Sequence, residues 1–473
     1  MITIADTLTD VGNGQRFAQD HREAARWLVD EQEWRIWDST HWRAYQTDER
    51  AMELAKATVA TIYQEAAVGD SDEDRKKIGA WARASQNTAR LQAMIKMAKS
   101  ERDLWASVDD FDRDPYLLNF TNATVDLRTG YWKQHDPRDM ISRLVPHAYN
   151  PYAQAPLWER LIHRCTQCDE TGGTAEFLKR ALGYMLVGSN PQQKFFLFVG
   201  PKRTGKSKVL EISARALGSD YAAVSQPKLI TRSRWNTHHD SETWSIRGKR
   251  LVVISETDAG MDLDEAVVKN LTGASVIAMR GLHRAKEIQA PVTWTLIVGT
   301  NEEPNIEKWD DAIGRRIVKI PSGPSLDPSE VDLDLESKII NEEVEGVLAR
   351  LVAGAMEWHR MRIACGDGLW MPPAVAKATS DFENDNDHVA EFIKAFIDFG
   401  ESCSVRLADV NKAYQQYRGK GPDALKSRAL YSRIIEYCRA NGYPVTKDHR
   451  MFYGLELAAE ISPAQQKWMA GNV

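Results

Sequence analysis

A glycine-rich break between an apolar run and a helix-like run constrains this chain more than any other feature. FFLFV (195–199) precedes the break, GPKRTGKS (200–207) forms it, and VLEISARAL (209–217) follows with helical spacing. A short, continuous apolar run is typical of a parallel strand that is covered on both faces. The order of strand, glycine loop and helix therefore predicts an α/β fold.

The break fits G-x-x-x-x-G-K-[ST], a pattern that binds the phosphates of a nucleoside triphosphate. Its glycines let backbone N–H groups curl around the phosphates, and the N-terminus of the following helix adds positive potential. We expect Lys206 to reach the β- and γ-phosphates and Ser207 to ligate Mg²⁺. The residues predicted to bind the nucleotide are Gly200, Pro201, Lys202, Arg203, Thr204, Gly205, Lys206 and Ser207.

Two further strand-like runs carry polar residues where each run ends. LVVIS (251–255) leads to Glu256 and Asp258, and TWTLIVGTN (293–301) ends in Asn301. A carboxylate at a strand end can polarise the attacking water or hold the metal through water. We expect Glu256 to be the base and a Mg²⁺ contact, with Asp258 the weaker candidate. Asn301 either senses the γ-phosphate or caps its strand.

An arginine pair, Arg315 and Arg316, follows Asn301 in GRRIVKIP. Adjacent surface arginines usually serve only solvation. Placed after a sensor strand, they can instead stabilise a transferring phosphate across a subunit boundary. Both arginines are therefore candidate catalytic residues, and the sequence does not separate them.

The segment before the third strand reads as a hairpin with a basic tip. VIAMRGL (276–282) and EIQAPVTW (287–294) are strand-like, and His283, Arg284 and Lys286 lie between them. Such a tip either is an exposed turn or contacts a nucleic-acid backbone without reading its sequence.

The N-terminal region is rich in tryptophan. Residues 1–115 show mostly helical spacing, as in HREAARWLV (21–29), and LLNFTNATVDLRTGYWKQH (117–135) suggests a small β element. The tryptophans at 27, 34, 37 and 42 fit a buried helical core better than a base-stacking platform, because they are interleaved with other apolar positions.

The C-terminal region is locally basic. Between residues 406 and 450 ten lysines and arginines face four acidic residues, although the whole chain has a net charge of −6. VRLADVNKAYQQYRG and SRALYSRIIEYCRANG predict two helices, and YPVTKDHRMFYGLEL predicts a hairpin, a pattern typical of a winged-helix module. Arg428 and Arg433 are the predicted DNA contacts, with a solvated face or a protein-docking module as the alternative.

Composition excludes several other classes of protein. No apolar run approaches the roughly 20 residues that span a bilayer, and the N-terminus lacks a signal-peptide pattern, so we expect a cytoplasmic protein without membrane contact. Cys165 and Cys168 form a CxxC, but no second pair completes a zinc site. Incidental cysteines are therefore favoured over a metal or redox site.

The order of these motifs resembles helicase superfamily 3, specifically the helicase half of phage and plasmid primase–helicases related to the poxvirus enzyme. The resemblance covers most of the chain, and upstream TDVGNGQRF looks like the family's N-terminal region. Its marks are GPKRTGKS, GKRLVVISE, VKNLTG, TLIVGTNEEPNI and AIGRRIVKIP. The family's usual LTGGD appears here as LTGAS (271–275), so no role is carried over for the missing acid.

The resemblance implies an AAA+-type P-loop ATPase that forms a ring, typically a hexamer, with ATP and Mg²⁺ at the subunit interfaces. Lys206, Ser207, Glu256 and Asn301 would act in one subunit, and Arg316, or else Arg315, would reach the neighbour's nucleotide. The basic hairpin tip would contact the DNA strand in the channel.

Four segments follow from these patterns. We expect an N-terminal domain with helices and a small β element (1–150), the ATPase (151–345), a helical extension (346–395) and the winged-helix-like module (396–473). In this family a primase domain often precedes the helicase, but this sequence begins almost at the helical region. We therefore expect no primer synthesis by this chain alone, and the resemblance suggests a separate primase as partner.

The predicted function is that of an ATP-dependent replicative DNA helicase of a phage or mobile element, acting as a ring on single-stranded and forked DNA in a bacterial host. The main alternative is an AAA+ ATPase that melts or loads at an origin without processive unwinding. A DNA-binding regulator with a decayed nucleotide site is disfavoured by the intact Gly205, Lys206 and Ser207. A small-molecule kinase would leave the basic C-terminal region without a use.

Overall fold

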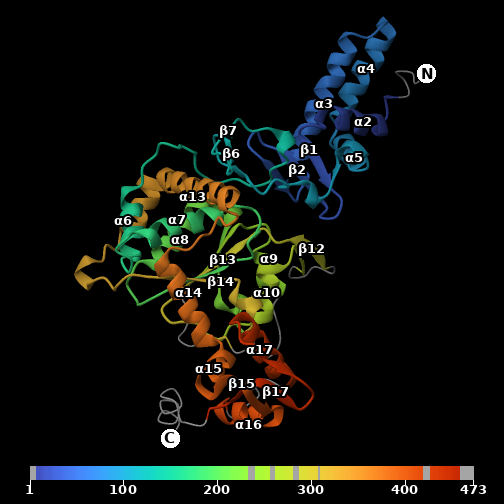
Figure 1. Cartoon of the computed structure of the whole chain (residues 1–473). Coiled ribbons are helices and arrows are strands. Elements are labelled where there is room, and N and C mark those ends of the chain that lie inside the picture. The colour runs from blue at the N-terminus through green and yellow to red at the C-terminus, as the bar shows by residue number, and fades with distance from the viewer. Residues whose placement is uncertain are drawn as a thin grey trace.

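The computed structural model describes residues 7–232, 240–255, 261–280, 287–306, 309–418 and 427–458 as a mixed α/β protein (Figure 1). No helix in these ranges is long and apolar enough to cross a membrane. The elements up to residue 150 are α2 (Asp10–His21), β1 (Ala25–Leu28), β2 (Glu33–Trp37), β3 (Trp42–Tyr45), α3 (Glu49–Ala67), α4 (Asp72–Ser85), α5 (Thr88–Ala98), η1 (Arg102–Leu104), β4 (Trp105–Ala106), η2 (Val108–Asp110), β5 (Leu117–Asn119), β6 (Thr124–Asp126), β7 (Trp132–Lys133) and η3 (Pro137–Asp139).

The tryptophan-rich stretch forms a sheet, so the helical reading of HREAARWLV is wrong. Strands β1, β2 and β3 are consecutive antiparallel neighbours, and Trp27 of β1 lies directly opposite Trp34 of β2. Trp27, Trp34 and Trp42 are all buried, which confirms that they belong to the core. The alternation of Trp34 and Ile36 toward the core, with Arg35 between them, is the two-residue period that the helical reading missed.

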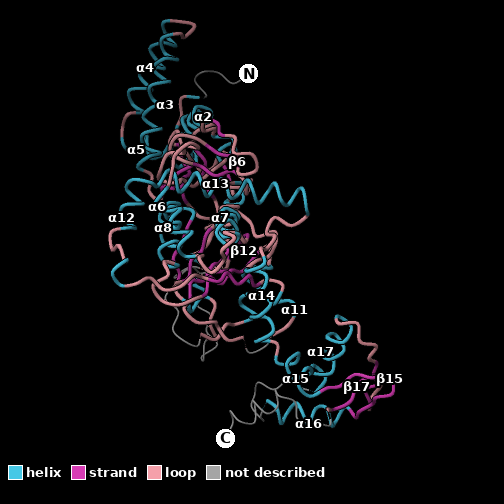
Figure 2. Tube along the Cα trace, turned by 60° about the vertical axis from the view of Figure 1, so that its left-hand side comes forward, coloured by secondary structure: helices cyan, strands magenta, loops and turns pink. Residues whose placement is uncertain are grey.

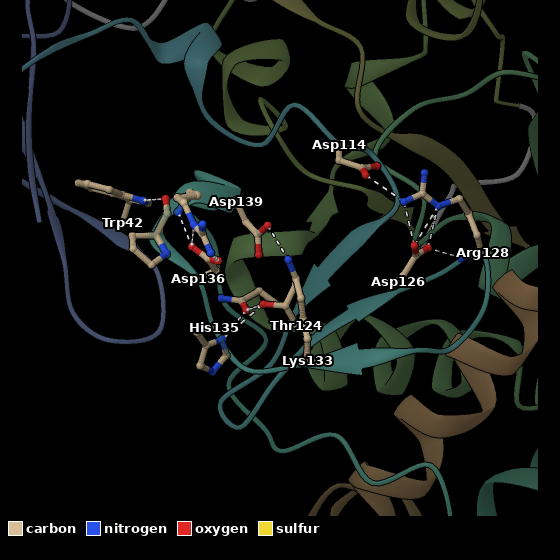
Figure 3. Close-up of polar contacts among 12 residues, drawn as sticks. Trp42, Asp114, Thr124, Asp126, Arg128, Lys133, His135, Asp136 and Asp139 are labelled. Carbon is tan, nitrogen blue, oxygen red and sulfur yellow. Dashed lines mark hydrogen bonds and ion pairs between the residues drawn. The ribbon is translucent and has the colours of Figure 1, made fainter. Parts of the chain in front are cut away.

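The predicted small β element is confirmed as the antiparallel sheet β5-β6-β7. Figure 3 shows the polar contacts around it: Arg128 bonds both Asp114 (3.1 Å) and Asp126 (2.8 Å). Trp42 of β3 donates its Nε1–H to the carbonyl of Pro137 at 2.8 Å. This bond ties the N-terminal sheet to the segment that follows β7.

The central region is built on five strands. Its elements are α6 (Pro156–Cys165), α7 (Gly173–Tyr184), β8 (Phe195–Val199), α8 (Lys206–Tyr221), β9 (Ala222–Ser225), η4 (Pro227–Leu229), α9 (Asp240–Ser245), β10 (Leu251–Ile254), α10 (Glu265–Gly273), β11 (Val276–Met279), β12 (Ile288–Pro291), β13 (Thr295–Thr300), α11 (Asp311–Gly314), β14 (Ile317–Pro321), η5 (Pro328–Glu330), α12 (Leu335–Lys338) and the π-helix η6 (Ile339–Glu343).

The five strands form a parallel sheet in the order β14-β8-β13-β10-β9, and three of them, β8, β10 and β13, are the strands that the apolar runs predicted. Alternate side chains enter two separate cores. Phe196 and Phe198 of β8 pack on the side of α7, α8 and α13 (Val344–Cys365), whereas Phe195 and Leu197 pack on the side of α10, the β11–β12 hairpin and α14 (Pro373–Asn386). Both faces of β8 are therefore buried, which explains its continuous apolar sequence.

The predicted hairpin is confirmed as the antiparallel pair β11–β12, with Val276 opposite Pro291. Its tip, residues 281–286, lies outside the described residues. Only three residues separate β12 from β13, so the hairpin emerges from the start of the central strand.

The C-terminal region contains the two predicted helices, α16 (Leu407–Arg418) and α17 (Ser427–Ala440), and the predicted hairpin of β16 (Thr446–Lys447) and β17 (Met451–Leu457). The helix α15 (His388–Phe396) and a ten-residue strand, β15 (Ile397–Arg406), precede them. The strand was not predicted, and it completes a sheet in the order β15-β17-β16. In the tube view of Figure 2 this region stands apart from the central sheet.

Candidate functional site

The candidate site lies at one edge of the parallel sheet, where the strands end. Gly200 follows the last residue of β8, and Asn301 follows the last residue of β13, its neighbour in the sheet. Because parallel strands end at the same edge, the fold itself brings these two positions together. Residues Gly200–Gly205 form the loop, and Lys206 is the first residue of α8.

Lys206 is the centre of this arrangement. Its ammonium donates hydrogen bonds to the carbonyl oxygens of Gly200 and Pro201, both at 2.7 Å. It also lies 3.2 Å from Thr204 Oγ1 and 3.4 Å from Asn301 Oδ1. Only 4% of Lys206 is exposed, and burial lowers the pKa of its ammonium. The loop thus holds a desolvated cation at a helix N-terminus, an arrangement that suits the binding of a phosphate group.

Two glycines let the loop approach its surroundings closely. A Cβ on Gly200 would lie 2.0 Å from the hydroxyl of Ser322, and Gly205 has a φ of +94°. A side chain at Gly205 would also meet Cys165 Sγ and Leu161 Cδ1, both at 2.8 Å. The first and last glycines of the motif are therefore required by packing and by backbone conformation.

Cys165 packs against the glycine loop, a role that the sequence did not indicate. Its thiol donates to the carbonyl of Thr204 at 3.0 Å, and burial raises its pKa to about 12. Cys168 is exposed, and its thiol contacts the carbonyl of Pro321 at 3.3 Å. Among the described residues no group of three or more His, Cys, Asp or Glu side chains could hold a metal.

The helix that carries Cys165 is fixed at its other end by Glu343. This buried carboxylate accepts hydrogen bonds from the backbone N–H groups of Leu157 and Trp158, with the shortest at 2.9 Å. These donors belong to the first turn of α6, where backbone N–H groups lack partners within the helix. Residues 186 positions apart thus hold α6, and with it Cys165, against the loop.

Several predicted site residues lie outside the described residues. They are Glu256 and Asp258, the candidate base and its alternative, and His283, Arg284 and Lys286 of the hairpin tip. Strand β10, which leads toward Glu256, ends at Ile254 beside Val298 of β13. The chain therefore leaves β10 at the same edge as the glycine loop.

Arg315 and Arg316 lie at the opposite edge of the sheet. They precede β14, whose first residue, Ile317, pairs with Phe195 at the start of β8. Five residues of β8 separate this edge from Gly200, a rise of roughly 16 Å. Arg316 donates to Gln193 Oε1 at 3.1 Å and to the carbonyl of Ala312 at 2.5 Å. Neither arginine meets the Lys206 site of its own chain.

The two arginines predicted to contact DNA differ in their surroundings. Arg428 is exposed on α17. Arg433, on the same helix, has a side chain that is only 13% exposed and pairs with Asp387 at 2.7 Å and with Asp311 of α11. Two carboxylates thus engage its guanidinium, so its geometry does not favour contact with a DNA phosphate.

Comparison with known proteins links two parts of the chain to families. Residues 14–167 match the family described as "D5 N terminal like", and residues 198–316 match a family of unknown function, DUF5906. The second match begins in β8 and ends at Arg316, so it covers the glycine loop, Asn301 and the arginine pair.

Two viral proteins are similar to this chain. A putative helicase of Acanthamoeba polyphaga mimivirus is 26% identical over 216 residues, which cover 45% of this chain and 22% of the relative. A putative helicase of Invertebrate iridescent virus 6 is 24% identical over 271 residues, or 56% of this chain and 28% of the relative. The chain spans about a quarter of the length of these relatives. Together with the N-terminal match, the similarities support a relationship to D5-type primase–helicases.

Two solved structures are distantly similar to this chain. Two apo structures of the NrS-1 C-terminal region align with TM-scores of 0.42 and 0.40, at 12% and 13% identity. Each alignment covers 65% of this chain and 77% of the other. At these scores we draw no structural conclusion from them.

Proposed function

We propose that this chain is an ATP-dependent replicative DNA helicase with an AAA+-type P-loop core that translocates on single-stranded DNA as a ring. The observation that carries the proposal is the separation of the site into two halves. Lys206 and Asn301 meet at one edge of the sheet, and Arg316 lies at the other. A complete site then requires a second copy of the chain.

The residues of the glycine loop suit ATP. The triphosphate would replace the Gly200 and Pro201 carbonyl oxygens as the partners of the Lys206 ammonium, and backbone N–H groups at the start of α8 would face the phosphates. Ser207, on the first turn of α8, supplies a hydroxyl for Mg²⁺, with Glu256 as its second contact and as the base. Asn301, 3.4 Å from the Lys206 ammonium, is positioned to contact the γ-phosphate.

The arginine pair would act on the neighbouring subunit. Since Arg316 cannot reach the loop of its own chain, it would meet the nucleotide of the next copy, as the resemblance to superfamily 3 also implies. A guanidinium suits this role because it stays charged and can bond two phosphate oxygens at once. The same arrangement in every copy closes a ring, with six copies as the family's usual number.

Two regions would contact DNA. The β11–β12 hairpin is rooted in the buried start of β13 and carries the basic residues His283, Arg284 and Lys286 at its tip. The C-terminal winged-helix-like module presents Arg428 on an exposed face. We place this activity on a phage or mobile-element genome in the host cytosol, with a separate primase as partner.

An ATPase that melts or loads at an origin, without processive unwinding, is the second candidate. Such an ATPase would use the same two halves of the ATP site. The two differ in the use of the hairpin, which must advance along the strand only in a helicase.

Strand displacement on forked DNA tests the proposal. We expect ATP-dependent displacement by the wild type and its loss in Lys206→Ala and in Arg316→Ala. Lys377→Ala and Arg360→Ala, which remove exposed cations on α14 and α13, are the matched controls and should unwind normally. A mixture of the two inactive variants should recover part of the activity, because some interfaces then pair an intact Lys206 with an intact Arg316. Robust hydrolysis without displacement on any fork would favour the loader.

A further inference from the structure

A cavity of about 760 Å³ opens at the edge of the sheet that carries Arg316. Its apolar wall comes from η2 and the segment after it, from the end of α10 and from the base of the hairpin: Val108, Phe111, Ala274, Val276, Pro291 and Val292. Arg316 lies against this wall, because its Nη2 contacts two residues that line the cavity, Gln193 and Gly273. It donates to Gln193 Oε1 and would lie 2.4 Å from a Cβ on Gly273. The cavity therefore adjoins the half of the site that a neighbour would use.

The cavity lining is more basic than acidic. It includes four arginines, Arg113, Arg143, Arg247 and Arg250, against Asp109 and Asp112. Arg250 is buried and bonds the carbonyls of Leu117 and Leu186, so it belongs to the wall. Arg143 pairs with Asp112 and Arg247 pairs with Glu31, whereas Arg113 at the rim pairs with Asp110 at 2.5 Å and keeps a side chain that is 69% exposed. An acidic partner with an apolar side chain would match both properties of this surface.

A segment of this chain has that chemistry. Residues 327–336 contain five acidic residues and no lysine or arginine. Within it Leu333 is 86% exposed and Val331 is 39% exposed. Removing these two side chains from water would be favourable, which gives the segment an apolar contribution to any contact that buries it.

This acidic segment begins directly on the glycine loop. The backbone N–H of Leu326 donates to the carbonyl of Arg203, and the hydroxyl of Ser325 donates to the carbonyl of Lys202, both at 2.8 Å. At its far end Glu336 pairs with Lys208 and Arg215 on α8. The segment is thus anchored to the nucleotide half of the site at both ends.

The cavity and the acidic segment lie on different sides of the core. In Figure 1 the gold segment that leads into α12 projects at the left, whereas β12, at the cavity, lies at the right edge, and Figure 2 also labels α12 and β12 apart. A chain cannot fill its own cavity with this segment. Two different surfaces on opposite sides of one molecule form a head-to-tail contact, which is the kind that closes rings.

We propose that Leu333 and Val331 of one copy insert into the cavity beside Arg316 of the next copy, with the flanking acidic residues against Arg113 at the rim. This contact rests on the proposed ring, in which it would align neighbouring subunits. Because the acidic segment is bonded to the glycine loop, its docking would carry the neighbour's Lys202–Arg203 backbone toward Arg316. The contact would therefore position the two halves of the ATP site as well as join the subunits.

The first test compares Leu333→Asp with Ile363→Asp, a matched control that places the same charge at an equally exposed apolar position on α13 (75% exposed). Assembly is measured by mass photometry with ATP across a concentration series, and folding by circular dichroism. We expect Leu333→Asp to raise the concentration needed for ring formation by about tenfold or more, with an unchanged thermal melt. Ile363→Asp should assemble like the wild type.

The second test is cross-linking between separate chains. In a background with Cys168 and Cys365 replaced by serine, one chain carries Leu333→Cys and the other Val276→Cys, and diamide is the oxidant. We expect a covalent dimer only in the mixture of the two, and none when Ile363→Cys replaces Leu333→Cys. A wild type that stays monomeric with ATP would overturn the ring itself. A wild-type ring with unimpaired Leu333→Asp assembly and no mixed cross-link would overturn this contact alone.

Discussion

At the residue scale, the ammonium of Lys206 has a full set of oxygen partners within its own chain. Two carbonyls, a hydroxyl and the Asn301 amide surround its ammonium. A ligand that offers only one weak acceptor would gain little by displacing them, whereas a triphosphate supplies several charged oxygens. If the loop binds ATP as proposed, the bonds that Lys206 gives up would favour a polyphosphate over a weaker ligand.

The strand, loop and helix around Lys206 were predictable because the motif is local in sequence. Gly200 to Ser207 are contiguous, and the strand before them and the helix after them follow from their own patterns. Cys165 and Glu343 were not predictable, because each acts on residues 39 or more positions away. The CxxC drew attention to Cys165 for metal binding, but only the fold shows that its thiol meets Thr204.

Cys165 should be chemically silent in the folded protein. Burial raises the pKa of its thiol to about 12, so the neutral thiol, which is not the nucleophile, prevails at pH 8. We expect iodoacetamide at pH 8 to label the exposed Cys168 and Cys365 and to leave Cys165 unlabelled until urea unfolds the chain. Peptide mass spectrometry with and without urea measures this. Rapid labelling of Cys165 without urea would contradict its packing against the loop.

At the element scale, α17 is tied to the helix that precedes the arginine pair. Arg433 of α17 pairs with Asp311, the first residue of α11, and with Asp387, which caps α15. Glu383 lies nearby, and burial together with the charges of Asp387 and Asp311 raises its pKa. One guanidinium thus offsets several carboxylates at the junction between the C-terminal module and the core.

Arg433→Ala should destabilise this junction by about 2 kcal/mol, less than a fully buried pair would lose because Asp311 is half exposed. A carboxyl whose pKa is raised on folding binds its proton more tightly in the folded state, so acidification favours folding. In Arg433→Ala the pKa of Glu383 should rise further, because the Arg433 charge lowers it in the wild type. The stability lost by the substitution should therefore be smaller at about pH 5 than at about pH 8. Urea unfolding at both values measures it. Arg428→Ala on the same helix should leave stability unchanged.

The hairpin should couple hydrolysis to movement. Replacing His283, Arg284 and Lys286 with neutral residues should abolish strand displacement and spare basal ATP hydrolysis, because β11 and β12 keep their place in the core. Paired measurements of displacement and phosphate release test this. Equal loss of both activities would show that the tip serves the ATP site, and unchanged displacement would exclude a translocating role.

Helices and strands were predictable to different degrees. Strands β8, β10 and β13 were found because every residue in them is buried and each reads as a continuous apolar run, whereas β9 and β14 are partly exposed and were not predicted. In β1 to β3 Trp27, Trp34 and Trp42 each stand next to an arginine, and over such short strands the two-residue period resembles part of a helical one. Strand β15 was missed for two reasons. Its pairing is irregular between Phe399 and Ser404, which interrupts any alternation of apolar residues, and its partner β17 lies some fifty residues later in the chain.

At the scale of the whole molecule, the two halves of the proposed ATP site lie at opposite edges of the sheet in a single copy. Turnover per chain should therefore rise with protein concentration from the nanomolar to the micromolar range and level off when assembly is complete. Steady-state phosphate release, compared with mass photometry on the same samples, checks whether the two curves coincide. Turnover independent of concentration, from a chain that remains monomeric, would mean that one copy completes its own site.

The strand β13 has a mechanical consequence. Asn301 lies at one end of it, and at the other end three residues lead back to β12 and the hairpin. All six residues of the strand are buried between two cores, and Trp294 clamps its start by donating to the carbonyl of Leu271 at 3.1 Å. A hydrogen-bonded strand in a close-packed interior neither stretches nor buckles appreciably. If ATP is bound as proposed, a displacement of Asn301 would therefore reach the hairpin almost undiminished through this rigid strand.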